Sequence, residues 1–110
     1  MKKFSQGKDR LEQPAFAPPF SEDTKVLVLE AETGEVQAVP TGAEFVRITP
    51  SAAAYVRRSG EAVIPTVDMS GETAPILIGA GRDKTFQLEG AGTIGVISSS
   101  AAIVTLEFWS

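Results

Sequence analysis

Residues 101–109, AAIVTLEFW, have an alternating pattern that decides the fold. Successive side chains of a β-strand point to opposite faces, so every second residue shares a face. The first face, which we expect to line the core, carries Ala102, Val104, Leu106 and Phe108. The second face carries Ile103, Thr105, Glu107 and Trp109. A period of two over this length predicts a β-strand.

The rest of the sequence from Lys25 onward repeats this pattern in shorter runs. The runs are rich in Val, Ile, Thr and Phe and are broken by Gly, Pro, Ser or Asp, which is typical of short strands and turns. They predict strands at 25–31, 35–39, 44–49, 53–57, 75–79, 84–88, 93–98 and 101–109. Residues 51–56 (SAAAYV) leave one short helical turn as an alternative. Seven or eight short strands predict an all-β fold, an antiparallel sandwich or a small barrel, and of these we expect a β-sandwich of jelly-roll or immunoglobulin-like type.

Local features predict how two pairs of these strands meet. Residues 32–34 (ETG) join the first two runs, and a three-residue connection with a glycine at its end predicts that 25–31 and 35–39 form a hairpin. Arg47 and Arg57 could face one another across adjacent strands, although surface charges of this kind more often serve solubility.

Residues 1–22 differ from the strand-rich domain, which we place at residues 23–110. This segment shows neither helical nor strand periodicity, so it predicts an extended N-terminal arm. Proline lowers the entropy lost when such an arm is laid along a partner, and phenylalanine fills apolar pockets. The candidate partner-binding residues are Phe4, Pro14, Phe16, Pro18, Pro19 and Phe20. The alternative is a disordered tail whose aromatic residues have no partner.

Charge and the distribution of apolar residues argue against two classes of partner. The chain has a net charge of −4, and residues 1–20 carry +2, so the remaining residues carry −6. An acidic body lacks the clustered Lys and Arg that nucleic-acid phosphates need. No run approaches the roughly 20 apolar residues of a membrane span, so we expect neither nucleic acid nor membrane as a partner.

The composition also excludes most familiar catalytic chemistry. The 110 residues include no histidine and no cysteine, which excludes ordinary zinc sites, Ser-His-Asp or Cys-His nucleophiles and disulfides. Glycine clusters at 79–82 and 90–95 lie between predicted strands and are explained by tight turns. Residues 68–72 (DMSGE) resemble half of a calcium loop, but alternate acidic positions are missing and an exposed polar loop accounts for them. We expect no enzyme, no metal and no cofactor.

A domain of this size has a thin core, so burial in a homo-oligomer would help to stabilise it. Exposed Ile103 and Trp109 would suit such an interface, or Trp109 could instead cover one end of its own core. Tyr55, Phe86 and Trp109 could form a sugar-stacking platform, although core or interface packing is the better explanation.

The stretch from Glu44 to the C-terminus resembles a family of small all-β bacteriophage virion proteins. The resemblance lies in the order and spacing of short motifs over about 60% of the chain. These are Val46-Arg47-Ile48, Ala54-Tyr55-Val56, Pro65-Thr66, Leu77 to Gly81, Thr85-Phe86-Gln87-Leu88 and Ile94 to Ser98 before a closing hydrophobic strand.

The resemblance implies a β-sandwich that is a non-enzymatic structural component of a virus particle, made in the host cytoplasm. Within that family we expect a capsid decoration or cement protein, which binds the major capsid protein or another virion protein through its arm and body. It also implies a homo-oligomer, commonly a trimer. The alternative function is a carbohydrate- or host-receptor-binding module of a phage tail or fibre, which would use Tyr55 or Trp109.

Overall fold

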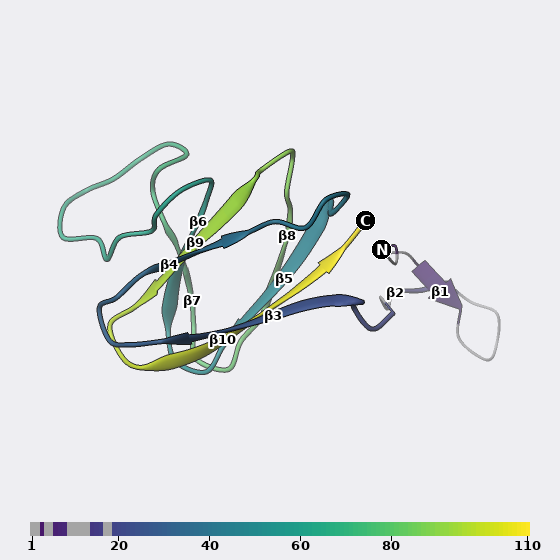
Figure 1. The fold of residues 1–110 in the computed structure, drawn as a ribbon, viewed down its shortest axis with the longest axis horizontal. Helices are drawn as coiled ribbons and strands as arrows, with labels where there is room; N and C mark the ends of the chain where they lie inside the picture. The colour runs from purple at the N-terminus through teal and green to yellow at the C-terminus, as the bar shows by residue number, and fades with distance from the viewer. Residues whose placement is uncertain (1–2, 4–5, 9–13, 17–18) are drawn as a thin grey trace.

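The computed structural model describes Lys3 and residues 6–8, 14–16 and 19–110. The described residues form ten strands and no helix, so this part of the chain offers no helix that could cross a membrane (Figure 1). The strands are β1 (Gln6–Lys8), β2 (Pro14–Phe16), β3 (Asp23–Leu29), β4 (Glu35–Ala38), β5 (Phe45–Pro50), β6 (Ala54–Arg58), β7 (Ile76–Ile78), β8 (Lys84–Gln87), β9 (Thr93–Ser98) and β10 (Ala102–Trp109).

Eight of these strands build two four-stranded sheets that pack face to face. The first sheet has the order β3-β10-β5-β8 and the second has the order β4-β9-β6-β7, with every neighbouring pair antiparallel. The all-β sandwich is therefore confirmed, and each of the eight predicted runs overlaps one strand. β3 begins two residues before its run, and β5 and β6 each end one residue after theirs. The helical alternative at 51–56 is wrong, because most of that stretch lies in β6 and the turn before it.

The strand pairing identifies the sandwich as a jelly roll. β3 pairs with β10, β4 with β9, β5 with β8 and β6 with β7, so the pairs are nested from the ends of the domain toward its middle. The domain is one long hairpin rolled into two sheets, with β6–β7 at its tip. Two further pairings, β5 with β10 and β6 with β9, complete the sheets.

The predicted hairpin between the first two runs is wrong. β3 and β4 belong to different sheets, and the turn between them crosses from one sheet to the other (Figure 1). The left-handed residue of this turn is Glu32 (φ 61°) rather than Gly34, and the Glu32 N–H donates to the carbonyl oxygen of Ser98 at 2.8 Å. The end of β9 therefore holds this turn in place.

The core lies between the inner faces of the two sheets. On β10 it contains the predicted face, since Ala102, Val104, Leu106 and Phe108 are all buried. The opposing sheet contributes apolar residues of β6 and β9. The largest buried core members besides those of β10 are Leu29, Val46, Ile48, Val56, Ile78, Leu88, Ile94 and Val96.

The loop that joins β6 to β7 lies partly over the outer face of the second sheet. A Cβ atom built on Gly95 of β9 would collide with the carbonyl oxygen of Gly60 and lie 2.6 Å from the nitrogen of Ala62. Ala62 is buried at this crossing. Gly95 is therefore the residue that lets the loop approach the sheet backbone.

The described strands of the N-terminal segment pair with each other. β1 and β2 are antiparallel, with Gln6 opposite Phe16, Gly7 opposite Ala15 and Lys8 opposite Pro14. Each strand is locally extended, but the segment doubles back instead of running as a single arm. Figure 1 places this small hairpin beyond the end of the sandwich at which β10 finishes.

Candidate functional site

Trp109 is buried at the end of β10, with none of its surface exposed. Its indole N–H donates a 2.9 Å hydrogen bond to the carbonyl oxygen of Pro19. The prediction that Trp109 is exposed at an oligomer interface is therefore wrong. The alternative, that it covers one end of its own subunit, agrees with the structure, because the chain that precedes β3 lies against it.

Ser21 fixes this preceding chain to β10. Its hydroxyl donates to the carbonyl oxygen of Phe108 at 2.8 Å and accepts from the N–H of Phe108 at 3.1 Å. It also accepts from the N–H of Asp23 at 3.1 Å. One side chain thus satisfies backbone groups on two strands at the point where β3 begins.

An ion pair on the outer face of the first sheet packs beside Trp109. Arg47 of β5 donates to both carboxylate oxygens of Glu107 at 3.0 Å, and its guanidinium carbon lies 5.4 Å from the centre of the Trp109 ring. The hydrogen bonds to Glu107 raise the pKa of Arg47, burial lowers it, and the charges of Glu107 and Asp83 raise it further. Arg47 does not face Arg57, because their strands lie in different sheets.

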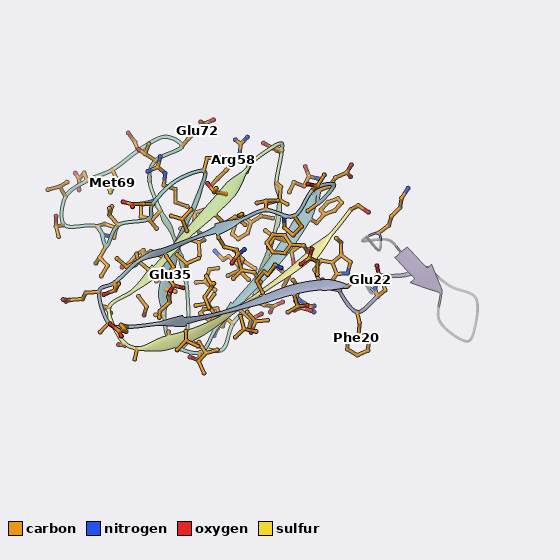
Figure 2. All side chains as sticks on the ribbon, in the orientation of Figure 1. Phe20, Glu22, Glu35, Arg58, Met69 and Glu72 are labelled. Atoms are coloured by element: carbon orange, nitrogen blue, oxygen red, sulfur yellow. The ribbon has the colours of Figure 1, made fainter. Side chains whose placement is uncertain are left out.

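These contacts define the root of the N-terminal segment, which we take as Pro19–Ser21. Pro19 and Ser21 are both held on β10, and Phe20 between them projects into solvent with 91% of its surface exposed (Figure 2). Of the other predicted partner-binding residues, Pro14 and Phe16 are the end residues of β2. Phe4 and Pro18 lie outside the described residues.

A second apolar feature lies on the outer face of the first sheet. Val26, Val28 and Ile103 are exposed by 59%, 70% and 51%, and Ile103 is directly opposite Val28 across β10 and β3. Ile103, a predicted interface residue, is accessible. The prediction omits the two valines, although the run KVLVL at 25–29 places apolar residues on both faces of its strand.

The predicted sugar-stacking platform does not form. Tyr55 lies on β6 in the second sheet, opposite Leu77 and Ile97. Phe86 lies on β8 in the first sheet, and Trp109 is fully buried. The three aromatic residues therefore share no exposed surface.

Hollows in the described surface supply few groups for chemistry. A cavity of about 60 Å³ between the sheets is lined mostly by apolar side chains, among them Ile76, Phe86 and Ile94. A hollow of about 350 Å³ beside the β3–β4 turn holds Glu32, Glu35 and Glu61. Among the described residues, no three carboxylates are arranged to hold a metal ion.

The predicted half calcium loop lies in the β6–β7 loop. Its Glu72 carboxylate is 3.9 Å from the guanidinium of Arg58, with the Glu72 side chain 90% exposed (Figure 2). The glycines at 79, 81, 90 and 92 lie at or beside the β7–β8 and β8–β9 turns, where Gly81 and Gly90 have positive φ angles of 69° and 82°. Gly95 instead lies within β9, so a turn does not explain it.

Comparison with known proteins gives no family. No protein-family model matches the sequence, and neither the curated proteins nor the solved structures include a significant match.

Proposed function

We propose that this protein is a non-enzymatic structural component of a bacteriophage particle, a capsid decoration or cement protein. In this proposal residues 1–18 attach the protein to the capsid lattice, and the sandwich lies on the lattice beside them. The partner is the major capsid protein or another virion protein, and the protein acts in the assembled particle.

The observation that carries the proposal is the anchoring of the root. Ser21 and Trp109 fix the backbone of residues 19–21 to β10, so the segment leaves the body at one defined place. A segment that is attached to a rigid body at a fixed point loses less entropy on binding than one that leaves from a mobile linker. This is the behaviour that an attachment segment requires.

The charge distribution supports the same assignment. Residues 1–18 contain four basic and two acidic residues, whereas residues 19–110 contain six basic and twelve acidic residues. The segment is therefore drawn to acidic protein surfaces that would repel the body. Two phenylalanines, Phe4 and Phe16, supply apolar side chains of the kind that anchor interfaces.

The fold is compatible with the proposal but does not carry it. Jelly rolls occur in viral capsid proteins and also in lectins and cupins. A fold of this kind supports many functions, so the assignment rests on the anchored segment, its charge and the resemblance of residues 44–110 to small virion proteins.

The proposal is tested on phage particles that lack this protein, obtained by deleting its gene from the phage genome. The full chain is added to the purified particles, and bound protein is measured after sedimentation through a density gradient. We expect saturable binding that a deletion of residues 1–18 abolishes. This deletion keeps Pro19 and Ser21, so it retains the contacts that hold β3 to β10.

Two point variants make the experiment sharper. The double substitution Phe4→Ser and Phe16→Ser should weaken binding by about tenfold or more, since anchor aromatics commonly contribute about 2 kcal/mol or more. Val67→Ser is the matched control, because Val67 is 74% exposed in the β6–β7 loop. Absence of the protein from wild-type particles, or binding that survives the deletion, would refute the proposal.

A further inference from the structure

The outer edge of β3 is unpaired among the described residues, since β3 is the end strand of its sheet and pairs only with β10, along its other edge. Both backbone groups of Phe108 meet Ser21 on the β3 side, and Phe108 is opposite Asp23. Backbone groups alternate between the two sides of an antiparallel strand. The backbone groups of Asp23 point toward β10, where its N–H meets the Ser21 hydroxyl. Those of Thr24, Val26 and Val28 therefore point to the free edge.

An apolar row accompanies this edge. Burial alternates without interruption from residue 19 to residue 29, so Phe20 shares the outward pattern of Val26 and Val28. Val28 is also directly opposite Ile103 of β10. A seven-residue free edge with exposed β-branched side chains is a template for another strand.

The charges of β3 indicate which partner fits its free edge. The body carries a net charge of −6, which opposes contact between most faces of two copies. β3 is different, because Asp23 and Lys25 lie on one face and pair at 3.2 Å, so its net charge is zero. A strand of this composition is complementary to itself when it runs antiparallel.

We propose that two copies of this chain pair edge to edge through β3, antiparallel about a two-fold axis at Thr24, and thereby form one continuous eight-stranded sheet. In such a two-fold pair, side chains from the same face of the two copies lie opposite one another only if the axis passes through a residue rather than between two residues. Registers centred on Lys25, Val26 or Leu27 place Lys25 opposite a second Lys25, Leu27 or Leu29. Only the register centred on Thr24 places each Asp23 opposite Lys25 of the other copy.

This register also covers the two ends of the apolar row, while Val26 within the row lies opposite Glu22 of the other copy. It places Phe20 of one copy beside Val28 of the other, in line with Ile103 on the next strand. Phe20 therefore contacts a second copy rather than the capsid lattice. The contact is two-fold, unlike the threefold association that the resemblance implies, and it does not depend on where the protein acts.

A cysteine scan reads the register directly, because the chain has no cysteine of its own. In the proposed dimer, Thr24→Cys lies opposite its own copy at a Cα separation of about 5.5 Å, within reach of a disulfide. Val26→Cys lies about 13 Å from its copy, because the two residues are offset by about four positions along the strand. Under mild oxidation we expect a covalent dimer from Thr24→Cys and none from Val26→Cys; the reverse result would overturn the register.

A charge exchange tests whether the ion pairs form between copies. Asp23→Lys alone and Lys25→Asp alone each place like charges opposite one another, so each should weaken dimerisation at least about tenfold in sedimentation velocity. Mixing the two variants should restore a heterodimer, since at both contacts a lysine of one copy then faces an aspartate of the other. Restoration on mixing cannot arise from the ion pair within one copy.

The apolar contact is tested by Phe20→Ser and by Ile103→Ser, with Val67→Ser as the control. Both test variants should weaken the dimer by about tenfold, while the control leaves it unchanged. Circular dichroism of each variant establishes that the fold is intact. A full-length wild-type protein that stays monomeric up to about 1 mM, or a dimer insensitive to Asp23→Lys and Phe20→Ser, would overturn the proposal.

Discussion

The indole N–H of Trp109 donates to the carbonyl oxygen of Pro19 at 2.9 Å, which joins residues 90 positions apart. The same side chain lies under the guanidinium of Arg47 and is completely buried. One residue at the end of β10 thus holds the chain that enters β3. The stability of this end of the sandwich and the placement of the N-terminal segment are consequently coupled.

Replacing Trp109 tests this coupling. We expect Trp109→Phe to lower the free energy of unfolding by about 1–3 kcal/mol, because the carbonyl of Pro19 loses its donor. Trp109→Ala should cost about 3–5 kcal/mol, since it also leaves a cavity. Urea denaturation followed by far-UV circular dichroism measures both values. Equal stability of Trp109→Phe and wild type would show that the hydrogen bond contributes nothing.

The hydroxyl of Ser21 should matter far more than an ordinary surface hydroxyl. Ser21→Ala leaves the backbone N–H and carbonyl of Phe108 without this partner, so we expect a loss of about 1–3 kcal/mol in urea denaturation. Ser70→Ala, at an exposed position of the β6–β7 loop, is the control and should stay within about 0.5 kcal/mol of wild type. A loss no larger than that of the control would contradict the role given to Ser21.

Gly95 should not tolerate a side chain. In Gly95→Ala the new methyl group meets the backbone of Gly60 and Ala62, so the loop must move and we expect destabilisation of about 1–3 kcal/mol. Gly92→Ala is the matched control, because no atom lies within 4 Å of a Cβ built there. Thermal unfolding of both variants checks the contrast, which fails if the two melt together.

The ion pair between Arg47 and Glu107 should be insensitive to alkaline pH. A raised pKa in the folded protein gives stability that is lost only as the pH rises through that pKa, and Arg47 already titrates far above neutrality. Because Arg47 is one-third exposed, we expect Arg47→Met to cost only about 1 kcal/mol. The difference from wild type should stay constant from about pH 7 to about pH 11 in urea denaturation. A difference that vanishes between about pH 8 and about pH 10 would contradict this assignment.

Much of the fold could be predicted because burial follows local alternation. The core face of β10 is correct residue by residue, and turn-forming residues separate all eight strands of the sandwich. The hairpin at 25–39 failed because a local turn signal does not report whether the chain stays in one sheet. Glu32 takes the left-handed conformation where its N–H meets Ser98, a residue distant in the sequence.

The candidate site was less predictable than the fold, since its contacts join distant residues. Trp109 shares a strand face with Ile103, yet one is buried and the other exposed; the chain at Pro19 and the guanidinium of Arg47 lie against Trp109. The bridge from Ser21 to Phe108 spans 87 residues. Alternation predicts which face a residue occupies but not which segment later covers that face.

The nested strand pairing determines when each strand can pair during translation. β3 is synthesised well before its partner β10, which is the final strand of the jelly roll. Ser21 and Phe108, which bond to each other, are 87 residues apart in the sequence. Until β10 is synthesised, β3 and the phenylalanine-containing segment before it have no partner strand in the nascent chain. Exposed β-branched and aromatic side chains favour chaperone binding or aggregation. Codon choice between β3 and the end of β10 should therefore influence the yield of folded protein more than codon choice before β3.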